Sequence, residues 1–210
     1  MNKETNNQAE LAGVILSEPE YSHTVYGETF YLMDIGVARN SGTVDKIRLL
    51  ISEKLFEKDD KYTGKTVRVS GEYRSFNKHE NDTSRLLLFL FVNDIEETDC
   101  TCEDDVKTNS IELEGNICRE PIYRKTPFGR EIADLLIAVN RAHGKSDYIP
   151  CITWGRNAKS ASRIEVGTRV RVEGRIQSRE YVKRISETEA ENRIAYEVSA
   201  SRIEVIKDDE

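Results

Sequence analysis

The sequence predicts an all-β protein that folds as two tandem five-stranded barrels, each with one short helix. Two observations predict this. The chain repeats itself with a period of about a hundred residues, which is the size of a domain rather than of a solenoid repeat. In both copies, short segments that alternate apolar and polar residues are separated by turn residues, a pattern typical of small barrels and sandwiches.

The repeat is visible as a series of identical residue pairs. Sliding the chain against itself by 102 residues aligns eight of them, from Leu11 with Leu113 to Gly27 with Gly129. The alignment continues without a gap, and after one inserted residue it continues at an offset of 103. Because chance does not produce such a series, the two copies are expected to share one fold. Further identical pairs are Arg39 with Arg141, Asp45 with Asp147, Gly64 with Gly167 and Ser75 with Ser178.

The pattern of the second copy places its elements in order. Its first strand alternates Ile111, Leu113 and Ile117 with polar residues, and Gly115 stands where a bulge or tight bend would let a small barrel close. One later stretch, about 157–164, favours a helix between the third and fourth strands, the place that an OB fold gives its helix. The other strands are expected at about 131–141, 147–154, 168–179 and 195–206.

Domain boundaries follow from the repeat and from the composition. The segment 99–109 is acidic and has no apolar periodicity, so it is expected to be a linker between the copies. The expected organisation is a flexible N-terminus at 1–10, a first OB fold at 11–98, the acidic linker at 99–109, a second OB fold at 110–206 and a tail at 207–210.

Charge is distributed unequally between the two copies. A net charge of −7 argues against contact with phosphates, which requires cations. Residues 11–98, however, hold 11 basic and 15 acidic residues, whereas residues 110–206 hold 17 basic and 14 acidic ones. A nucleic-acid surface is therefore expected on the second copy.

Cysteine usage and hydropathy narrow the class of protein. The four cysteines form neither a dense disulfide framework nor the paired spacing of a zinc site, so no metal and no cofactor are expected. No apolar run approaches the roughly 18 residues of a membrane span, and the first residues lack the apolar core of a signal peptide. A cytoplasmic, nucleoid-associated protein with no membrane partner is expected. The cysteines are Cys100, Cys102, Cys118 and Cys151.

Strand four of the second copy places four arginines on one face. Because side chains alternate along a strand, Val170, Val172 and Ile176 are expected to face the core and the arginines to face outward. Such a stripe can follow a phosphate backbone, and guanidinium groups also stack on bases. The alternative, a solvated face held by ion pairs, stays open. The four are Arg169, Arg171, Arg175 and Arg179.

Aromatic residues lie among these cations. Tyr123 falls in the predicted loop between strands one and two, and Tyr181 is expected to begin the loop between strands four and five. OB folds bind oligonucleotides with these two loops. Tyr148 and Trp154 bracket strand three at an even spacing, so both are expected on its open face, where stacking contributes about 1–3 kcal/mol per base. A core position for Trp154 is the open alternative.

The first copy lacks most of these features. The positions of Tyr148 and Tyr181 are occupied there by Lys46 and Lys78, and the face of its fourth strand is less basic. The first copy is therefore expected to be a degenerate OB fold that serves mainly assembly.

The second copy resembles bacterial single-stranded DNA-binding proteins over almost all of its length. The resemblance rests on GNICREPIYRKTPFGREIADLLIAVNR from Gly115, SDYIPCITWGRNA from Ser146, VGTRVRVEGRIQSREY from Val166 and AYEVSAS from Ala195. It implies an OB fold, a preference for single-stranded DNA and base stacking at Tyr148, Trp154 and Tyr181. It also implies units of four OB folds, which two copies per chain would reach as a homodimer. Typical members end in an acidic tip with Pro-Phe, whereas this chain ends in IKDDE, so recruitment through that tip is not expected.

The predicted function is sequence-tolerant binding and protection of single-stranded DNA in replication, recombination or repair. The alternatives are an accessory OB protein similar to primosomal replication protein N, which would act mainly through contacts with replication or primosome proteins, and an RNA-binding protein. The sequence contains no recognisable catalytic nucleophile, glycine-rich phosphate-binding loop or pair of catalytic carboxylates, so an enzyme is not expected. The predicted nucleic-acid-binding residues are Tyr123, Arg124, Lys125, Arg141, Tyr148, Trp154, Arg156, Arg171, Arg175, Arg179, Tyr181 and Lys183.

Overall fold

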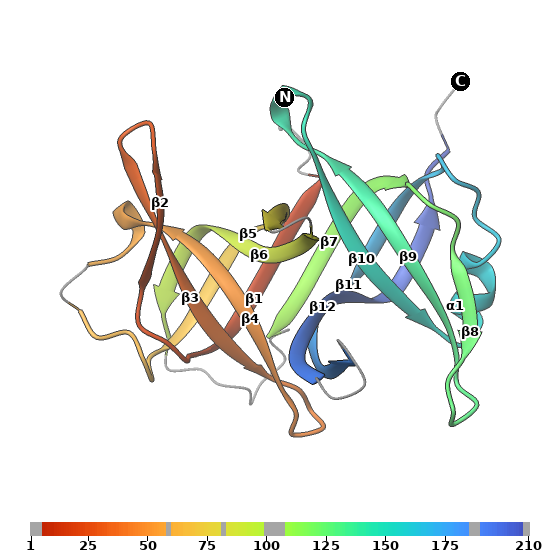
Figure 1. Cartoon of the computed structure of the whole chain (residues 1–210), viewed down its shortest axis with the longest axis horizontal. Helices are drawn as coiled ribbons and strands as arrows, with labels where there is room; N and C mark the ends of the chain where they lie inside the picture. The colour runs from red at the N-terminus through yellow and green to blue at the C-terminus, as the bar shows by residue number, and fades with distance from the viewer. Residues whose placement is uncertain (1–5, 58–59, 81–82, 99–107, 185–189, 208–210) are drawn as a thin grey trace.

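A computed structural model describes residues 6–57, 60–80, 83–98, 108–184 and 190–207. Two β-barrels lie side by side, and strand β1 of the first meets strand β7 of the second at the centre (Figure 1). Within the described residues, twelve strands form one hydrogen-bonded sheet in the order β2-β3-β4-β6-β5-β1-β7-β11-β12-β10-β9-β8. The predicted all-β class with two tandem OB barrels is confirmed.

The first barrel is formed by six strands, closed where β1 pairs with both β3 and β5 and where β4 pairs in parallel with β6. Between β4 and β5, the described residues hold a single 3-10 turn, η1, in place of the expected helix. The elements are β1 (Asn7–Ile15), β2 (Glu20–Val25), β3 (Glu28–Ala38), β4 (Val44–Ser52), η1 (Glu53–Leu55), β5 (Thr66–Glu80) and β6 (Thr83–Glu97).

The second barrel repeats this plan. It adds the expected helix α1, which begins after Gly155 at a positive φ of 58° and buries Ala158 and Ala161. Three strands differ from expectation: β8 occupies a segment predicted as loop, and β11 and β12 extend further into their hairpin. The elements are β7 (Asn109–Ile117), β8 (Ile122–Lys125), β9 (Glu131–Asn140), η2 (Ala142–Gly144), β10 (Ser146–Trp154), α1 (Arg156–Ala161), β11 (Arg169–Arg184) and β12 (Ala190–Val205).

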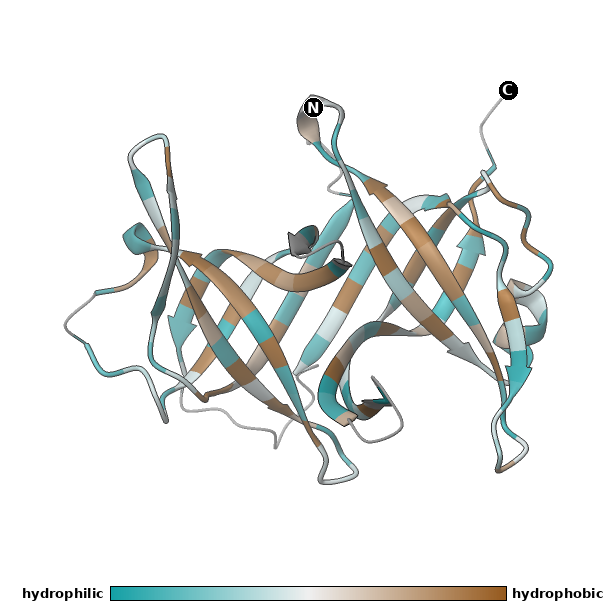
Figure 2. Ribbon diagram, in the orientation of Figure 1, coloured by the Kyte–Doolittle hydropathy of each residue, from teal (hydrophilic) through white to brown (hydrophobic). Residues whose placement is uncertain are grey.

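Alternation of apolar and polar residues builds both barrels, as the banding of the strands in Figure 2 shows. In β7, Ile111, Leu113 and Ile117 are buried while the residues between them are more exposed, apart from Gly115. Gly115 is itself buried and pairs in register with Val170, so no bulge occurs there. Its lack of a side chain serves another purpose, because a Cβ at this position would lie 2.4 Å from the carbonyl oxygen of Ala138 in β9.

Replacing Gly115 with alanine is expected to destabilise the second barrel. The added methyl group meets backbone rather than a side chain that could move aside, and overpacking of this kind costs about 1–3 kcal/mol or more. The free energy of unfolding, measured with urea, should fall by that amount, whereas Ser110→Ala on the same strand should change it by less than about 0.5 kcal/mol. Equal midpoints for the two variants would show that β7 and β9 can move apart.

The two barrels are joined by a continuous ladder, which we call the seam. Strands β1 and β7 pair antiparallel from Asn7 with Leu113 to Leu11 with Asn109. The prediction of a flexible N-terminus at 1–10 is therefore wrong for residues 7–10, because all four pair with β7 and residues 9 and 10 also pair with β5. Residues 1–5, most of the predicted linker (99–107) and most of the predicted tail (208–210) lie outside the described residues.

Two asparagines at repeat-related positions fix the ends of this ladder. The Asn7 side chain donates to the Tyr73 carbonyl oxygen at 2.8 Å and accepts from the Tyr73 backbone N–H at 2.9 Å. Asn109 makes the same two bonds with Ile176, at 2.7 and 2.9 Å. The Tyr73 ring is fully buried, and one hydrophobic cluster contains residues of both barrels. The barrels therefore pack as one unit.

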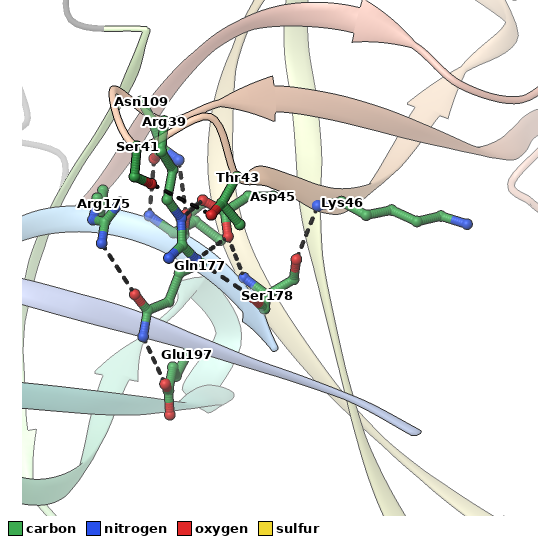
Figure 3. Close-up of polar contacts among 11 residues, drawn as sticks. Arg39, Ser41, Thr43, Asp45, Lys46, Asn109, Arg175, Gln177, Ser178 and Glu197 are labelled. Atoms are coloured by element: carbon green, nitrogen blue, oxygen red, sulfur yellow. Dashed lines mark hydrogen bonds and ion pairs between the residues drawn. The ribbon is translucent and has the colours of Figure 1, made fainter. Parts of the chain in front are cut away.

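A second set of repeat-related residues clamps the barrels together, and Figure 3 shows one half of it. In that half, the Asp45 carboxylate accepts from the Ser178 backbone N–H at 2.7 Å, and the Ser178 hydroxyl accepts from the Lys46 N–H at 2.9 Å. In the other half, Asp147 accepts from the Ser75 N–H at 2.7 Å, and the Ser75 hydroxyl accepts from the Tyr148 N–H at 2.8 Å. We call these four bonds the seam clamp; each half joins one barrel to the other.

Candidate nucleic-acid interface

Trp154 stands on the surface at the end of β10. Its side chain is 39% exposed, while Ile149 and Cys151 are buried, so the outward phase predicted from the spacing is confirmed and a core position is wrong. The ring lines a groove of about 790 Å³ that crosses from β10 to the seam. Other residues of this groove are Gln8, Glu112, Asn157, Glu173, Arg175 and Ser199.

Tyr148 is exposed on the same side of β10, six residues before Trp154. Its side chain is 41% exposed, and an extended strand would separate the two residues by about 20 Å. The Tyr148 backbone N–H donates to the hydroxyl of Ser75, which belongs to the first barrel. The first barrel therefore holds the backbone on which one of the two rings stands.

The arginines of β11 do not form one continuous stripe. Arg169 and Arg171 both pair with Glu114 of β7, and Arg171 also lies 3.3 Å from Glu112, so the ion-paired alternative holds for these two. These contacts, with desolvation opposing them, lower the pKa of Glu114. Further along β11, the pairing with β12 shifts in register between Glu173 and Gly174. Arg175, which comes after this shift, lines the same groove as Trp154. Gln177, two residues further along β11, is buried and donates to the Glu197 carboxylate.

The far end of the β11–β12 hairpin carries another cation and ring. The Arg179 guanidinium lies 5.8 Å from the centroid of the Tyr181 ring, within the range of a cation–π contact. Tyr181 was expected in a loop, but it belongs to β11 and pairs with Arg193 of β12. Lys183 also belongs to β11, two residues further along.

Strand β8 carries three of the predicted residues, and two of them, Tyr123 and Arg124, interact with carboxylates of β9. The Tyr123 hydroxyl is hydrogen-bonded to the Glu131 carboxylate, which raises the pKa of Tyr123 and contributes most to lowering the pKa of Glu131. Arg124 forms a two-pronged ion pair with Asp134 at 2.7 and 3.2 Å. Lys125 is exposed beside them. The segment was predicted as a loop, but all four of its residues pair with β9.

Arg141 has a structural role in the seam rather than a place on the open surface. Its Nε lies 3.2 Å from the fully buried carboxylate of Asp147, as Arg39 lies against Asp45 in the first barrel. The prediction that Arg141 contacts nucleic acid is therefore wrong, because its guanidinium is held by Asp147. Arg156, at the start of α1, is exposed as expected.

The predicted residues thus form separate groups rather than one cluster. One group is the groove of Trp154 and Arg175, one is Tyr148 at the seam, one is Arg179 with Tyr181, and one is β8. Two further exposed rings, Tyr26 at 104% and Phe128 at 93%, lie at the tips of the β2–β3 and β8–β9 hairpins, outside these groups, and were not among the predicted residues. Their identical position in the repeat was the signal that could have found them.

The described part of the chain contains no group of three or more metal-ligating side chains that could hold a metal ion. Cys118 and Cys151 are free thiols, and burial raises the pKa of both. Cys100 and Cys102 lie outside the described residues. None of the helices in the described residues is both long and apolar enough to cross a membrane.

Comparison with known proteins supports the resemblance read from the sequence. Residues 108–206 match the model of the single-strand binding protein family. Single-stranded DNA-binding protein A of Bacillus subtilis is 35% identical over 80 residues, which cover 35% of this chain and 46% of the relative. The corresponding protein of Oceanobacillus iheyensis is 38% identical over 80 residues, covering 35% and 50%. The chain thus spans about half the length of these curated relatives.

The likeness in structure extends over both barrels. A deletion mutant of the single-stranded DNA binding protein from Thermus aquaticus has a TM-score of 0.74 at 21% identity, covering 97% of this chain and 95% of that one. The wild-type protein from the same organism gives a TM-score of 0.71 at 22% identity. At this level of identity the match shows that the two proteins share a fold. The shared fold includes both OB barrels of the present chain. The predicted resemblance of the second barrel to the family is confirmed, and the structural match extends the shared fold over both barrels.

Proposed function

We propose that the chain binds single-stranded DNA with little regard to sequence, as its family match in residues 108–206 suggests. The observation that carries the proposal is the exposure of Trp154 and Tyr148 on the outward side of β10, in a surface that also holds Arg175. Exposed rings accept any base by stacking, and nearby cations pair with phosphates. Neither interaction requires the duplex, whose bases already stack on each other.

The proposed binding set has two kinds of members. Tyr148, Trp154 and Tyr181 would stack on bases, with Tyr123 as a fourth ring. The cations that would neutralise phosphates are Arg124, Lys125, Arg156, Arg175, Arg179 and Lys183, with Arg171 contributing less because two carboxylates already pair with it. The role would be to coat and protect single strands during replication, recombination or repair, at the nucleoid.

We further propose that two chains associate to present four barrels, and that the first barrel serves mainly this assembly. The relatives from Bacillus and Oceanobacillus resemble this chain over a single barrel's length, whereas the Thermus protein matches both barrels. A dimer of the present chain would be detected as a doubled mass by light scattering. A monomer at the concentrations that bind DNA would contradict this part of the proposal.

The function can be tested by the fluorescence of Trp154, the only tryptophan of the chain. Poly-dT should quench it strongly, because a stacked base contacts the ring, and duplex DNA should quench it weakly. The logarithm of the binding constant should fall with the logarithm of salt concentration by about 0.7 for each phosphate contact. Poly-U at equal salt serves as the comparison for RNA.

Each other outcome points to a different function. Equal quenching by duplex and poly-dT would remove the preference for single strands. Stronger quenching by poly-U than by poly-dT would make RNA the ligand. A weak response to all three polymers would favour an accessory protein that acts through protein contacts.

A further inference from the structure

The first barrel places three cations beside the β11–β12 hairpin of the second. Lys46 and Arg48 come from β4, and Arg85 comes from β6. The Lys46 backbone N–H donates to the hydroxyl of Ser178 at 2.9 Å, so β4 lies directly against β11 at this point. The Lys46 side chain extends away from the seam clamp (Figure 3), and Arg179 follows Ser178 on the neighbouring strand.

The local carboxylates do not neutralise these cations. Lys46 Nζ and Arg48 Nε each lie 3.1 Å from one oxygen of the same residue, Asp34, and both cationic side chains remain 46% exposed. Glu20 acts on Arg48 as a second negative charge. Arg85 and Arg179 are exposed as well, so four cations face two carboxylates. This positive excess lies on a chain whose first barrel is acidic overall.

A ring of the second barrel lies among these cations. Tyr196 of β12 pairs with Ser178 in the strand register. Burial raises the pKa of the Tyr196 hydroxyl and the Asp34 charge raises it further, while the charges of Arg48, Lys46 and Arg85 oppose that rise. Tyr181, which has Arg179 over its face, lies further along the same hairpin.

The repeat gives these observations a simple meaning. Lys46 occupies in the first barrel the position that Tyr148 occupies in the second, and the backbone N–H of each donates to a serine of the opposite barrel. The two halves of the seam clamp are therefore equivalent in backbone but different in side chain. One half presents a ring and the other presents a cation.

We infer that Lys46, Arg48, Arg85 and Arg179, here called the seam cluster, form a phosphate subsite for single-stranded DNA that both barrels build together. The inference rests on the proposed function, which it extends to the first barrel. A strand whose bases stack on the second barrel would pass its backbone over the seam cluster, where the excess positive charge would neutralise phosphates. The first barrel would then contact DNA and not serve assembly alone.

The test uses the full chain with Lys46→Gln, Arg85→Gln and the double variant. Arg48 is left unchanged in these variants, so that the buried carboxylate of Asp34 keeps one ion-pair partner when Lys46 is replaced. The control is the double variant Lys54→Gln with Lys61→Gln, which removes the same charge from exposed sites of the first barrel outside the seam. Binding to poly-dT is followed by Trp154 fluorescence over a range of salt concentrations, and thermal melting checks that each variant is folded.

Loss of both seam cations should reduce the salt slope by about 1.4, which corresponds to two phosphate contacts on a single strand, and the control should leave it unchanged. An unchanged slope in the seam variant, or an equal reduction in the control, would overturn the inference while leaving the proposed function in place. Absence of poly-dT binding by the unmodified chain would instead overturn the proposed function.

Discussion

Replacing both Tyr148 and Trp154 with alanine is expected to weaken binding to oligo-dT by about 2–6 kcal/mol, since each stacked base contributes about 1–3 kcal/mol. That is a loss of roughly thirty-fold to twenty-thousand-fold. Both rings stand about 40% exposed on β10, so their removal opens no cavity and the fold should be retained. Because the double variant has no tryptophan, binding is measured by the fluorescence anisotropy of a labelled oligo-dT.

The control removes an exposed aromatic ring from outside the proposed surface. Tyr26 is fully exposed at the tip of the β2–β3 hairpin and has a φ of 49°, a conformation that asparagine tolerates, so Tyr26→Asn should be neutral in stability. We expect it to change oligo-dT affinity less than threefold. If Tyr26→Asn weakened binding as much as the double variant, the surface would have to be placed at the hairpin tips instead of on β10.

The outward position of these two rings could be predicted because it depends only on local alternation. Strand β10 is regular over its length, pairing with β9 without a register shift, so the phase that buries Ile149 and Cys151 also exposes Tyr148 and Trp154. For β11 the same reasoning correctly placed Val170, Val172 and Ile176 in the core, but it did not show that Arg169 and Arg171 would be engaged in ion pairs with strand β7. The pairing of β11 with β12 shifts at Glu173/Gly174, and its far end is held by the other barrel, and neither fact can be read from alternation.

The seam was missed for a different physical reason. The identities of Arg39, Asp45 and Ser75 with their counterparts marked the repeat, and they were interpreted as signs of a shared fold. In the structure, Asp45 and Ser75 each form a hydrogen bond with a residue of the opposite barrel. Their partners are about 70 to 130 positions away in the sequence. One sequence shows that such residues recur but not which partner each one meets.

Removing one carboxylate of the seam clamp is the second change expected to have a large effect. Asp45 is fully buried and accepts from Arg39 Nε at 2.6 Å and from the Ser178 N–H at 2.7 Å. Asp45→Ala would leave a partly buried guanidinium and a backbone donor without their acceptor, and breaking a buried pair in this way costs about 3–5 kcal/mol. Urea unfolding should show this loss directly.

The other half of the clamp should tolerate the same change better. The Oδ2 of Asp147 lies 3.2 Å from Arg141 Nε without a hydrogen bond, and burial raises the pKa of Asp147 above its ordinary value of 3.8. Its charged form is thus less well compensated, so Asp147→Ala should cost about 1–3 kcal/mol. Asp134→Ala is the control, because its pair with Arg124 is partly exposed and should contribute less than about 1 kcal/mol.

The dependence on pH separates the role of this charge from that of the hydrogen bonds. Since the pKa of Asp147 is raised by folding, the native state holds that proton more tightly than the unfolded chain does. The contribution of Asp147 to stability therefore falls as the pH rises from about 3.8 through its folded-state pKa. Asp147→Asn keeps an acceptor for the Ser75 N–H but cannot titrate, so its stability relative to the unmodified chain should improve across that range. A difference that stayed constant with pH would mean that Arg141 compensates the buried charge fully, and Asp147→Ala should then cost as much as Asp45→Ala.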